Sequence, residues 1–154
     1  MNILYQIALV LFLEPTSQSE YCQKYYPIAY LCEVVYGVPV SIQLAQALQE
    51  SGGGKSNIAK NSNNHFGIKY YKNAYNGHYF IDRKGIKWRA YDSVYESYID
   101  HAKFLNKHYR CACFKDYSHW AKLNGYAEKG YWKHICKIAK NKKLYLLDNH
   151  KQQN

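Results

Sequence analysis

The chain is short of acidic residues and of long apolar runs. Only 11 of its 154 residues are Asp or Glu, against 21 Lys or Arg, and the formal net charge is +10. Such an excess indicates an anionic partner: a cell-wall polymer, a nucleic acid or an acidic lipid. The sequence also lacks Arg/Lys-rich runs, zinc-finger spacing and RNA-binding signatures, so we expect no nucleic acid as a partner.

The apolar stretch over residues 3–13 is 11 residues long, which is too short for a comfortable membrane span. Its length suits the core of a signal peptide, although Met1-Asn2 lacks the usual Lys or Arg. Ser17-Gln18-Ser19 offers a cleavage site of the small-x-small type. We therefore expect a leader over 1–19, a mature domain over 20–154, and export to the periplasm or the cell wall. An uncleaved anchor is the alternative.

Internal repeats and long linkers are also missing, so the length indicates one domain. The five cysteines lie at positions 22, 32, 111, 113 and 136 and match no common zinc pattern. In an exported protein, an odd number leaves at least one thiol unpaired or in an intermolecular bond.

Hydrophobic periodicity predicts a mostly helical domain with a small β lobe. Val40, Leu44 and Leu48 recur at helical spacing, and Pro39 suits the first helical position. Alternating residues on both sides of Gly85 predict a β-hairpin. Further helices are expected over 27–36 (burying Ile28, Leu31, Cys32 and Val35), after the capping box Ser93–Glu96, near 116–123 and from about 129.

Glu50 lies in the last turn of the expected helix, directly before Gly52–Gly54. A carboxylate there faces the negative end of the helix dipole, which disfavours its ionised form. If the site is also partly dry, the pKa of Glu50 rises toward the range of a general acid. The alternative is a solvated Glu at a frayed helix end, which surface frequencies alone favour.

Elimination among the few acids leaves Asp82 as the second candidate. Glu96 belongs to a capping box, and the others fall at helix ends, on helix surfaces or at the termini. General acid–base chemistry commonly uses a pair of carboxyl groups, and the hairpin would place Asp82 opposite Glu50. An Asp before Arg-Lys-Gly is equally ordinary in a turn.

Three motifs in order, ALQESG at 47–52, Lys55-Ser56 and NNHFGIK at 63–69, resemble the glucosaminidase family of peptidoglycan hydrolases. This is glycoside hydrolase family seventy-three, which includes autolysins and the flagellar rod-assembly hydrolase. The resemblance covers about residues 25–148 and continues through Arg89, Tyr91-Asp92-Ser93, Glu96-Ser97-Tyr98, Asp100-His101, Tyr117, Trp120-Ala121, Gly125-Tyr126-Ala127 and Tyr131.

The resemblance implies a lysozyme-like α+β fold with a cleft between a helical domain and the hairpin lobe. It further implies an endo-β-N-acetylglucosaminidase acting on peptidoglycan glycan strands, with Glu50 as the catalytic acid. We expect no metal or organic cofactor, and a monomer.

The same resemblance suggests the residues that bind substrate. Asn64 and Phe66 lie in the segment that forms the floor of the family's cleft, and Tyr126 would orient the sugar or its acetamido group. Tyr131 belongs to the same group of candidates, although packing between the last two helices is the favoured interpretation for it.

The hairpin departs from the family pattern because it carries few acids, with Phe80, Ile81 and Ile86 around Asp82. The base on the opposite face is then Asp82 or the acetamido group of the substrate, or activity is weakened. Two alternatives stay open: a muramidase or lytic transglycosylase on the same fold, and a wall-binding module that has lost catalysis.

Overall fold

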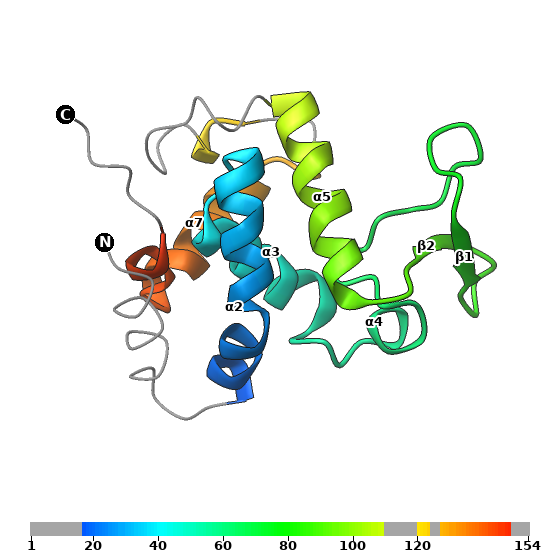
Figure 1. Cartoon of the computed structure of the whole chain (residues 1–154), viewed down its shortest axis with the longest axis horizontal. Coiled ribbons are helices and arrows are strands. Elements are labelled where there is room, and N and C mark those ends of the chain that lie inside the picture. Colours follow the sequence, from blue (N-terminus) through cyan, green and yellow to red (C-terminus); the bar gives the residue numbers. More distant parts are fainter. Residues whose placement is uncertain (1–16, 110–119, 124–126, 149–154) are drawn as a thin grey trace.

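A helical body and a small β lobe on one side of it make up the structure (Figure 1). The computed structural model describes residues 17–109, 120–123 and 127–148. The predicted mostly helical α+β fold with a hairpin lobe is confirmed. The elements in chain order are α2 (Ser17–Tyr36), α3 (Val40–Ser51), α4 (Asn57–Ser62), β1 (His78–Ile81), β2 (Lys87–Ala90), α5 (Val94–Tyr109), α7 (Tyr131–Asn141) and the 3-10 helix η2 (Leu144–Leu147).

Helix α3 is the centre of the body. Helices α2, α7 and η2 pack against it, and all its residues except Gln49 and Glu50 are buried. The predicted stripe of Val40, Leu44 and Leu48 is confirmed, at 0%, 0% and 8% exposure. Because α3 is covered on all sides, its position is fixed before the last turn emerges at the surface.

The start of α3 is held by two carboxylates from other parts of the chain. Pro39 is the N-cap and not the first helical residue as predicted. Glu33 accepts a hydrogen bond from the backbone N–H of Val40 at 3.1 Å, and Asp148 accepts from the N–H and hydroxyl of Ser41, both at 2.7 Å. Negative charge at a helix N-terminus is favourable, since the unpaired N–H groups and the dipole both attract it.

Helix α2 differs from its prediction. It begins at Ser17, ten residues before Pro27, which it contains; the expected cleavage site therefore lies in its first turn. Leu31 and Val35 were expected inside but are 49% and 56% exposed. The buried face is formed by residues that pack on α3 and α5, mostly tyrosines in the N-terminal half: Tyr21, Cys22, Tyr25, Tyr26, Ile28, Ala29 and Cys32.

The hairpin is confirmed as an antiparallel pair with Tyr79 opposite Arg89 and Phe80 opposite Trp88. The turn contains Gly85 at φ +78°, a conformation that glycine adopts without steric cost. Residues 68–70 run along the other edge of β2, since the N–H of Tyr70 donates to the carbonyl of Lys87 and the N–H of Arg89 to that of Ile68.

Helix α5 starts where the capping box predicts. The Ser93 hydroxyl accepts from the N–H of Glu96, and the Glu96 carboxylate accepts from the N–H of Asp92. The start of the helix expected near 116–123 lies outside the described residues, as do residues 1–13, Cys111, Cys113 and Tyr126. Cys22 and Cys32 are buried free thiols, and Cys136 is buried. None of the described helices has the length and apolar character required to cross a bilayer.

Candidate active site

Glu50 lies at the edge of the body that faces the β lobe. Helix α3 ends one residue later, where Gly52 takes the left-handed conformation at φ +58° and its N–H donates to the carbonyl of Leu48. Gly67, from the NNHFGIK motif, lies close to the Glu50 carboxyl group: a Cβ atom on this glycine would be 3.7 Å from Glu50 Oε2. A Cβ atom at position 67 would therefore touch the carboxylate at an ordinary contact distance, and the backbone there, at φ +61°, favours glycine.

Two side chains hold the Glu50 carboxyl group from behind. The Tyr131 hydroxyl, at the start of α7, donates to Glu50 Oε1 at 2.7 Å. It accepts in turn from Gln46 Nε2 at 3.2 Å. Gln46 lies one helical turn before Glu50 and is fully buried. The three groups form a directed chain from Gln46 through Tyr131 to Glu50, which fixes one oxygen and leaves the other toward Gly67.

The predicted rise in the pKa of Glu50 is confirmed in direction. Although the side chain is solvent-accessible, the protein around its carboxyl group removes enough water to raise the pKa, and the hydrogen bond from Tyr131 opposes that rise. The sequence argument invoked the helix dipole and a partly dry site, and loss of water is the larger cause in the structure.

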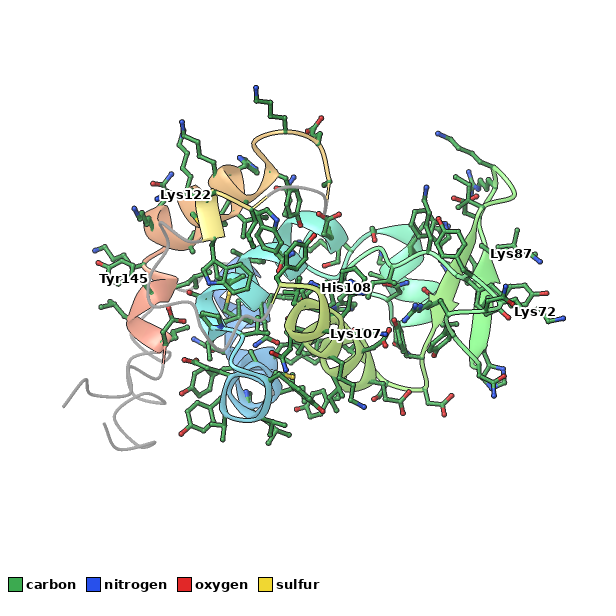
Figure 2. All side chains as sticks on the ribbon, turned by 90° about the horizontal axis from the view of Figure 1, so that it is seen from above. Lys72, Lys87, Lys107, His108, Lys122 and Tyr145 are labelled. Carbon is green, nitrogen blue, oxygen red and sulfur yellow. The ribbon has the colours of Figure 1, made fainter. Side chains whose placement is uncertain are left out.

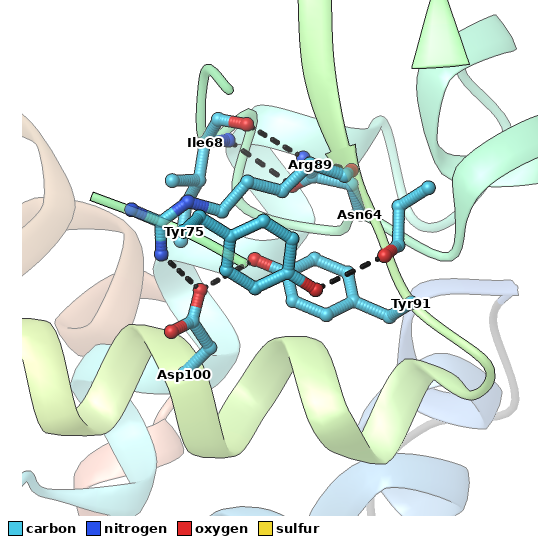
Figure 3. Close-up of polar contacts among 7 residues, drawn as sticks. Asn64, Ile68, Tyr75, Arg89, Tyr91 and Asp100 are labelled. Atoms are coloured by element: carbon cyan, nitrogen blue, oxygen red, sulfur yellow. Dashed lines mark hydrogen bonds and ion pairs between the residues drawn. The ribbon is translucent and has the colours of Figure 1, made fainter. Parts of the chain in front are cut away.

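Asn64 and Phe66 are buried, at 1% and 2% exposure, and act on the fold around the site. The Asn64 amide donates to the carbonyls of Ile68 and Arg89, and its oxygen accepts from the N–H of Ile68 (Figure 3). Phe66 stacks on His101 with ring centroids 3.8 Å apart. Both therefore fix the segment that carries Gly67 beside Glu50.

A polar cluster ties the lobe to α5 (Figure 3). Asp100 Oδ2 accepts from Arg89 Nη1 at 2.7 Å and from the Tyr91 hydroxyl at 2.6 Å. The Arg89 guanidinium lies over the ring of Tyr75, whose hydroxyl donates to the carbonyl of Ala90. Elimination had placed Asp100 on a helix surface, but its partners lie nine and eleven residues away and no local pattern predicts them.

Asp82 lies at the hairpin turn, and its carboxylate accepts three hydrogen bonds. Oδ1 accepts from the N–H groups of Lys84 and Ile86, and Oδ2 from Trp88 Nε1, each at 2.9 Å. These donors, the Trp88 bond first, lower the pKa of Asp82. This arrangement matches the interpretation of Asp82 as a turn residue, since all three donors belong to the same hairpin.

An open pocket of about 500 Å³ lies between α4 and the hairpin turn. It reaches the neighbourhood of Glu50 through Trp88, whose Cζ3 atom would be 4.0 Å from a Cβ on Gly67. The pocket combines an indole ring and aliphatic side chains with two cations; it is lined by Ser56, Asn57, Ile58, Asp82, Arg83, Lys84, Ile86 and Trp88.

His65 is a core residue. It is 3% exposed, its Nδ1 lies 2.6 Å from the hydroxyl of Tyr21, and burial lowers its pKa to about 4. Among the described residues, no group of three His, Cys, Asp or Glu side chains is placed to hold a metal ion. Gln46 and Gly67 are site residues to which the sequence argument gave no role; for Gln46 the available signal was its position four residues before Glu50, on the same helix face.

Similar folds occur among solved bacterial hydrolases, which confirms the lysozyme-like prediction. The catalytic domain of the autolysin Auto from Listeria monocytogenes is 22% identical, with a TM-score of 0.70 over 96% of this chain and 98% of that one. The glycoside hydrolase domain of Salmonella typhimurium FlgJ is 24% identical, with a TM-score of 0.67 over 83% and 89%. A peptidoglycan hydrolase from Sphingomonas sp. A1 is 23% identical, with a TM-score of 0.62 over 84% and 94%.

The sequence itself identifies the family. No curated protein matches the chain. A family model does match: Glucosaminidase, described as mannosyl-glycoprotein endo-beta-N-acetylglucosaminidase, aligns with residues 26–144, most of the chain and the whole of the site described above. The chain therefore belongs to the Glucosaminidase family and is a glycoside hydrolase.

Proposed function

We propose that this protein is an exported endo-β-N-acetylglucosaminidase that hydrolyses peptidoglycan strands after N-acetylglucosamine. Family membership supports the glycosidase chemistry. The substrate is suggested by the similar fold of an autolysin catalytic domain and of a peptidoglycan hydrolase. The observation that carries the proposal is Glu50: a carboxyl group with a raised pKa, held by Tyr131 at the junction of body and lobe.

In this proposal Glu50 is the general acid. Its raised pKa keeps it protonated over a wider range of pH than an ordinary Glu, so it can donate a proton to the leaving glycosidic oxygen. The oxygen that Tyr131 holds stays fixed, and the other oxygen faces the side of Gly67, where a sugar can approach without meeting a Cβ atom.

The opposite face of the sugar needs a second group, and we propose the acetamido group of the substrate in preference to Asp82. A carboxylate close to Glu50 would raise its pKa by repulsion, yet among the described residues only burial and Tyr131 account for the shift. The Asp82 carboxylate already accepts three hydrogen bonds within its own hairpin. Asp82→Asn should then retain most of the activity, whereas loss comparable to that of a Glu50 variant would restore Asp82 as the base.

The remaining candidate residues have two proposed roles: one contacts the sugar, and the others position the residues of the site. Asn64 and Phe66 are buried, so we propose that they position the segment around Gly67 and do not touch the sugar. Tyr131 acts on Glu50 through its hydroxyl while its ring packs against Trp132. Tyr126, which lies outside the described residues, stays the proposed contact to the sugar or its acetamido group.

The direct test is lysis of purified peptidoglycan, by turbidity and zymogram, with the wild type, Glu50→Gln and Glu128→Gln as an exposed control. We expect the Glu50 variant to lose at least about a hundredfold, as is typical when a general acid is removed, and the control to keep its activity. Circular dichroism checks that all three are folded. Equal lysis by the wild type and Glu50→Gln would refute the site, and wall binding without lysis by any of them would favour the wall-binding module.

Mass spectrometry of the products distinguishes the glycosidases. A reducing N-acetylglucosamine end is the expected result. The lone acid in the described site also suits a lytic transglycosylase, which needs one acid and an internal sugar hydroxyl; an anhydro-muramic acid end would show that reaction instead.

A further inference from the structure

The two faces of the β lobe differ. Side chains alternate across a strand, so Phe80 and its partner Trp88 share the face toward Gly67 and Asp82. Tyr79, Ile81, Lys87 and Arg89 share the opposite face. Arg89 reaches Asp100 of α5 and is largely buried, whereas Tyr79, Ile81 and Lys87 are exposed. Tyr70, which pairs with Lys87 along the edge of β2, joins this second face and meets the ring of Tyr79. We call the solvent-accessible part of this face the outer lobe face: Tyr70, Tyr79, Ile81 and Lys87, with the exposed Tyr71 and Lys72 that follow Tyr70 in the chain.

The outer lobe face combines exposed tyrosines with lysine ammonium groups. The rings of Tyr70 and Tyr79 lie 4.8 Å apart, and Lys87 Nζ lies 4.7 Å from the centre of the Tyr79 ring. Tyr79 is 46% exposed despite these contacts, and Tyr71 is 62% exposed. Figure 2 shows Lys72 and Lys87 at the lobe end of the molecule. The accessible groups of this face are therefore tyrosine rings and hydroxyls together with lysine ammonium groups.

Positive charge on the lobe is not neutralised locally. Residues 69–91 contain six cations and one acid: Lys69, Lys72, Arg83, Lys84, Lys87 and Arg89 against Asp82. The carboxylate of Asp82 is engaged by its turn and by Trp88, and only Arg89 has a carboxylate partner among the described residues, Asp100 on α5. The two lysines of the outer lobe face are thus left to attract an anion from outside.

We propose that the outer lobe face binds a linear anionic polymer of polyol or sugar units joined by phosphodiesters, attached to the wall on which the enzyme acts. Phosphate oxygens accept hydrogen bonds from ammonium and phenol groups, and the C–H surface of such units suits tyrosine ring edges. Nucleic-acid bases stack on free ring faces, and two of the three tyrosines here, Tyr70 and Tyr79, already pack against each other. A bilayer surface would need more apolar anchors than Ile81.

This binding does not depend on the catalytic assignment, because the outer lobe face points away from Trp88 and the Gly67 side of the lobe. The full chain carrying Glu50→Gln is therefore the right probe, since it would not dissolve the wall it binds. We would measure co-sedimentation with wall fragments over a salt series. The fragments would be used intact or stripped of phosphodiester-linked polymer with hydrofluoric acid.

The test variant is Lys72→Ser with Lys87→Ser, and the matched control is Lys133→Ser with Lys137→Ser on the exposed side of α7. Both pairs remove two positive charges. We expect the test pair to weaken binding to intact walls by roughly tenfold and to reduce its salt dependence, as loss of two phosphate contacts does, while the control changes binding less than about twofold. Stripped walls should bind the parent and both variants about equally weakly.

Three results would overturn the proposal. One is equal binding of the parent to intact and stripped walls. Another is an equal loss in the control pair, which would assign binding to net charge alone. The last is tighter binding, through the same two lysines, to a single-stranded oligonucleotide or to anionic phospholipid vesicles.

Discussion

The helical body and the β lobe are held together by different forces. In the body, α3 is surrounded by apolar side chains at 0% exposure, and burial of this kind stabilises in proportion to area without demanding particular partners. In the lobe, two four-residue strands are positioned by directed polar contacts: Arg89 and Tyr91 on Asp100, and Asn64 on two backbone carbonyls. Glu50, the proposed acid, therefore lies on the helical body, which apolar burial holds together. The facing wall of the site lies on the β lobe, which depends on a few polar contacts.

This contrast implies that the two regions fail differently. Damage to the body should unfold the whole chain, because the core is one cluster shared by α2, α3, α5, α7 and η2. Damage to the lobe contacts should loosen the lobe, and reduce activity, before the body unfolds.

The largest effect is expected in the body. Leu44→Ala removes a fully buried side chain from α3 and leaves a cavity, so we expect the free energy of unfolding to fall by about 2–5 kcal/mol. Leu31→Ala makes the same chemical change at 49% exposure and should cost no more than about 0.5 kcal/mol. Urea unfolding followed by circular dichroism measures the free energy of unfolding of both variants. Similar losses in the two would show that buried and exposed positions of the body do not differ as expected.

The second-largest effect is the loss of stability of the body when the pH is lowered. Burial lowers the pKa of His65 to about 4 in the folded protein, whereas the unfolded chain binds the proton near 6.5. Between these values the unfolded state binds more protons, so stability falls as pH falls, by about 3 kcal/mol at pH 4 from this group. His65→Gln can still bond the Tyr21 hydroxyl but does not titrate in this range. If His65→Gln lost as much unfolding free energy between pH 7 and 4.5 as the wild type does, the acid sensitivity could not be assigned to His65.

The lobe is tested by Asp100→Asn. Arg89 and Asp100 are 11% and 26% exposed, so the loss of charge should cost roughly 1–3 kcal/mol, less than a fully buried pair would. We expect amide hydrogen exchange to accelerate more in β1 and β2 than in α3, and activity to fall by a larger factor than the shift in global unfolding explains. Uniform acceleration across both regions would show that lobe and body unfold as one unit.

The smallest effect concerns the pKa of Glu50. The hydrogen bond from Tyr131 lowers that pKa, so Tyr131→Phe should raise it and move the alkaline limb of the pH–activity profile upward, by up to about one unit. Tyr95→Phe, which removes a hydroxyl from an exposed tyrosine in the first turn of α5, is the matched control. A downward move or an unchanged limb in the Tyr131 variant would show that its hydroxyl does not act on the acid.

Much of the body and part of the site could be predicted from the sequence. The spacing of Val40, Leu44 and Leu48 placed α3 and put Glu50 in its last turn, and the Gly85 turn and the Ser93–Glu96 box placed the hairpin and α5. Periodicity was right for Ile28 and Cys32 and wrong for Leu31 and Val35. It also missed Tyr21, Tyr25 and Tyr26 on the buried face of α2, because a simple pattern does not register the mixed polar and apolar character of tyrosine.

What the sequence by itself determined are features set within a few neighbouring residues: helix periodicity, the glycine ends and turns, the capping box, the excess of positive charge, and the order of motifs that marks the family. Tertiary structure alone decided the contacts between distant positions. Tyr131 reaches Glu50 across 81 residues, and Asp148 reaches Ser41 across 107. Such pairs leave no local pattern, because their geometry exists only after the helices pack and water is removed from around them.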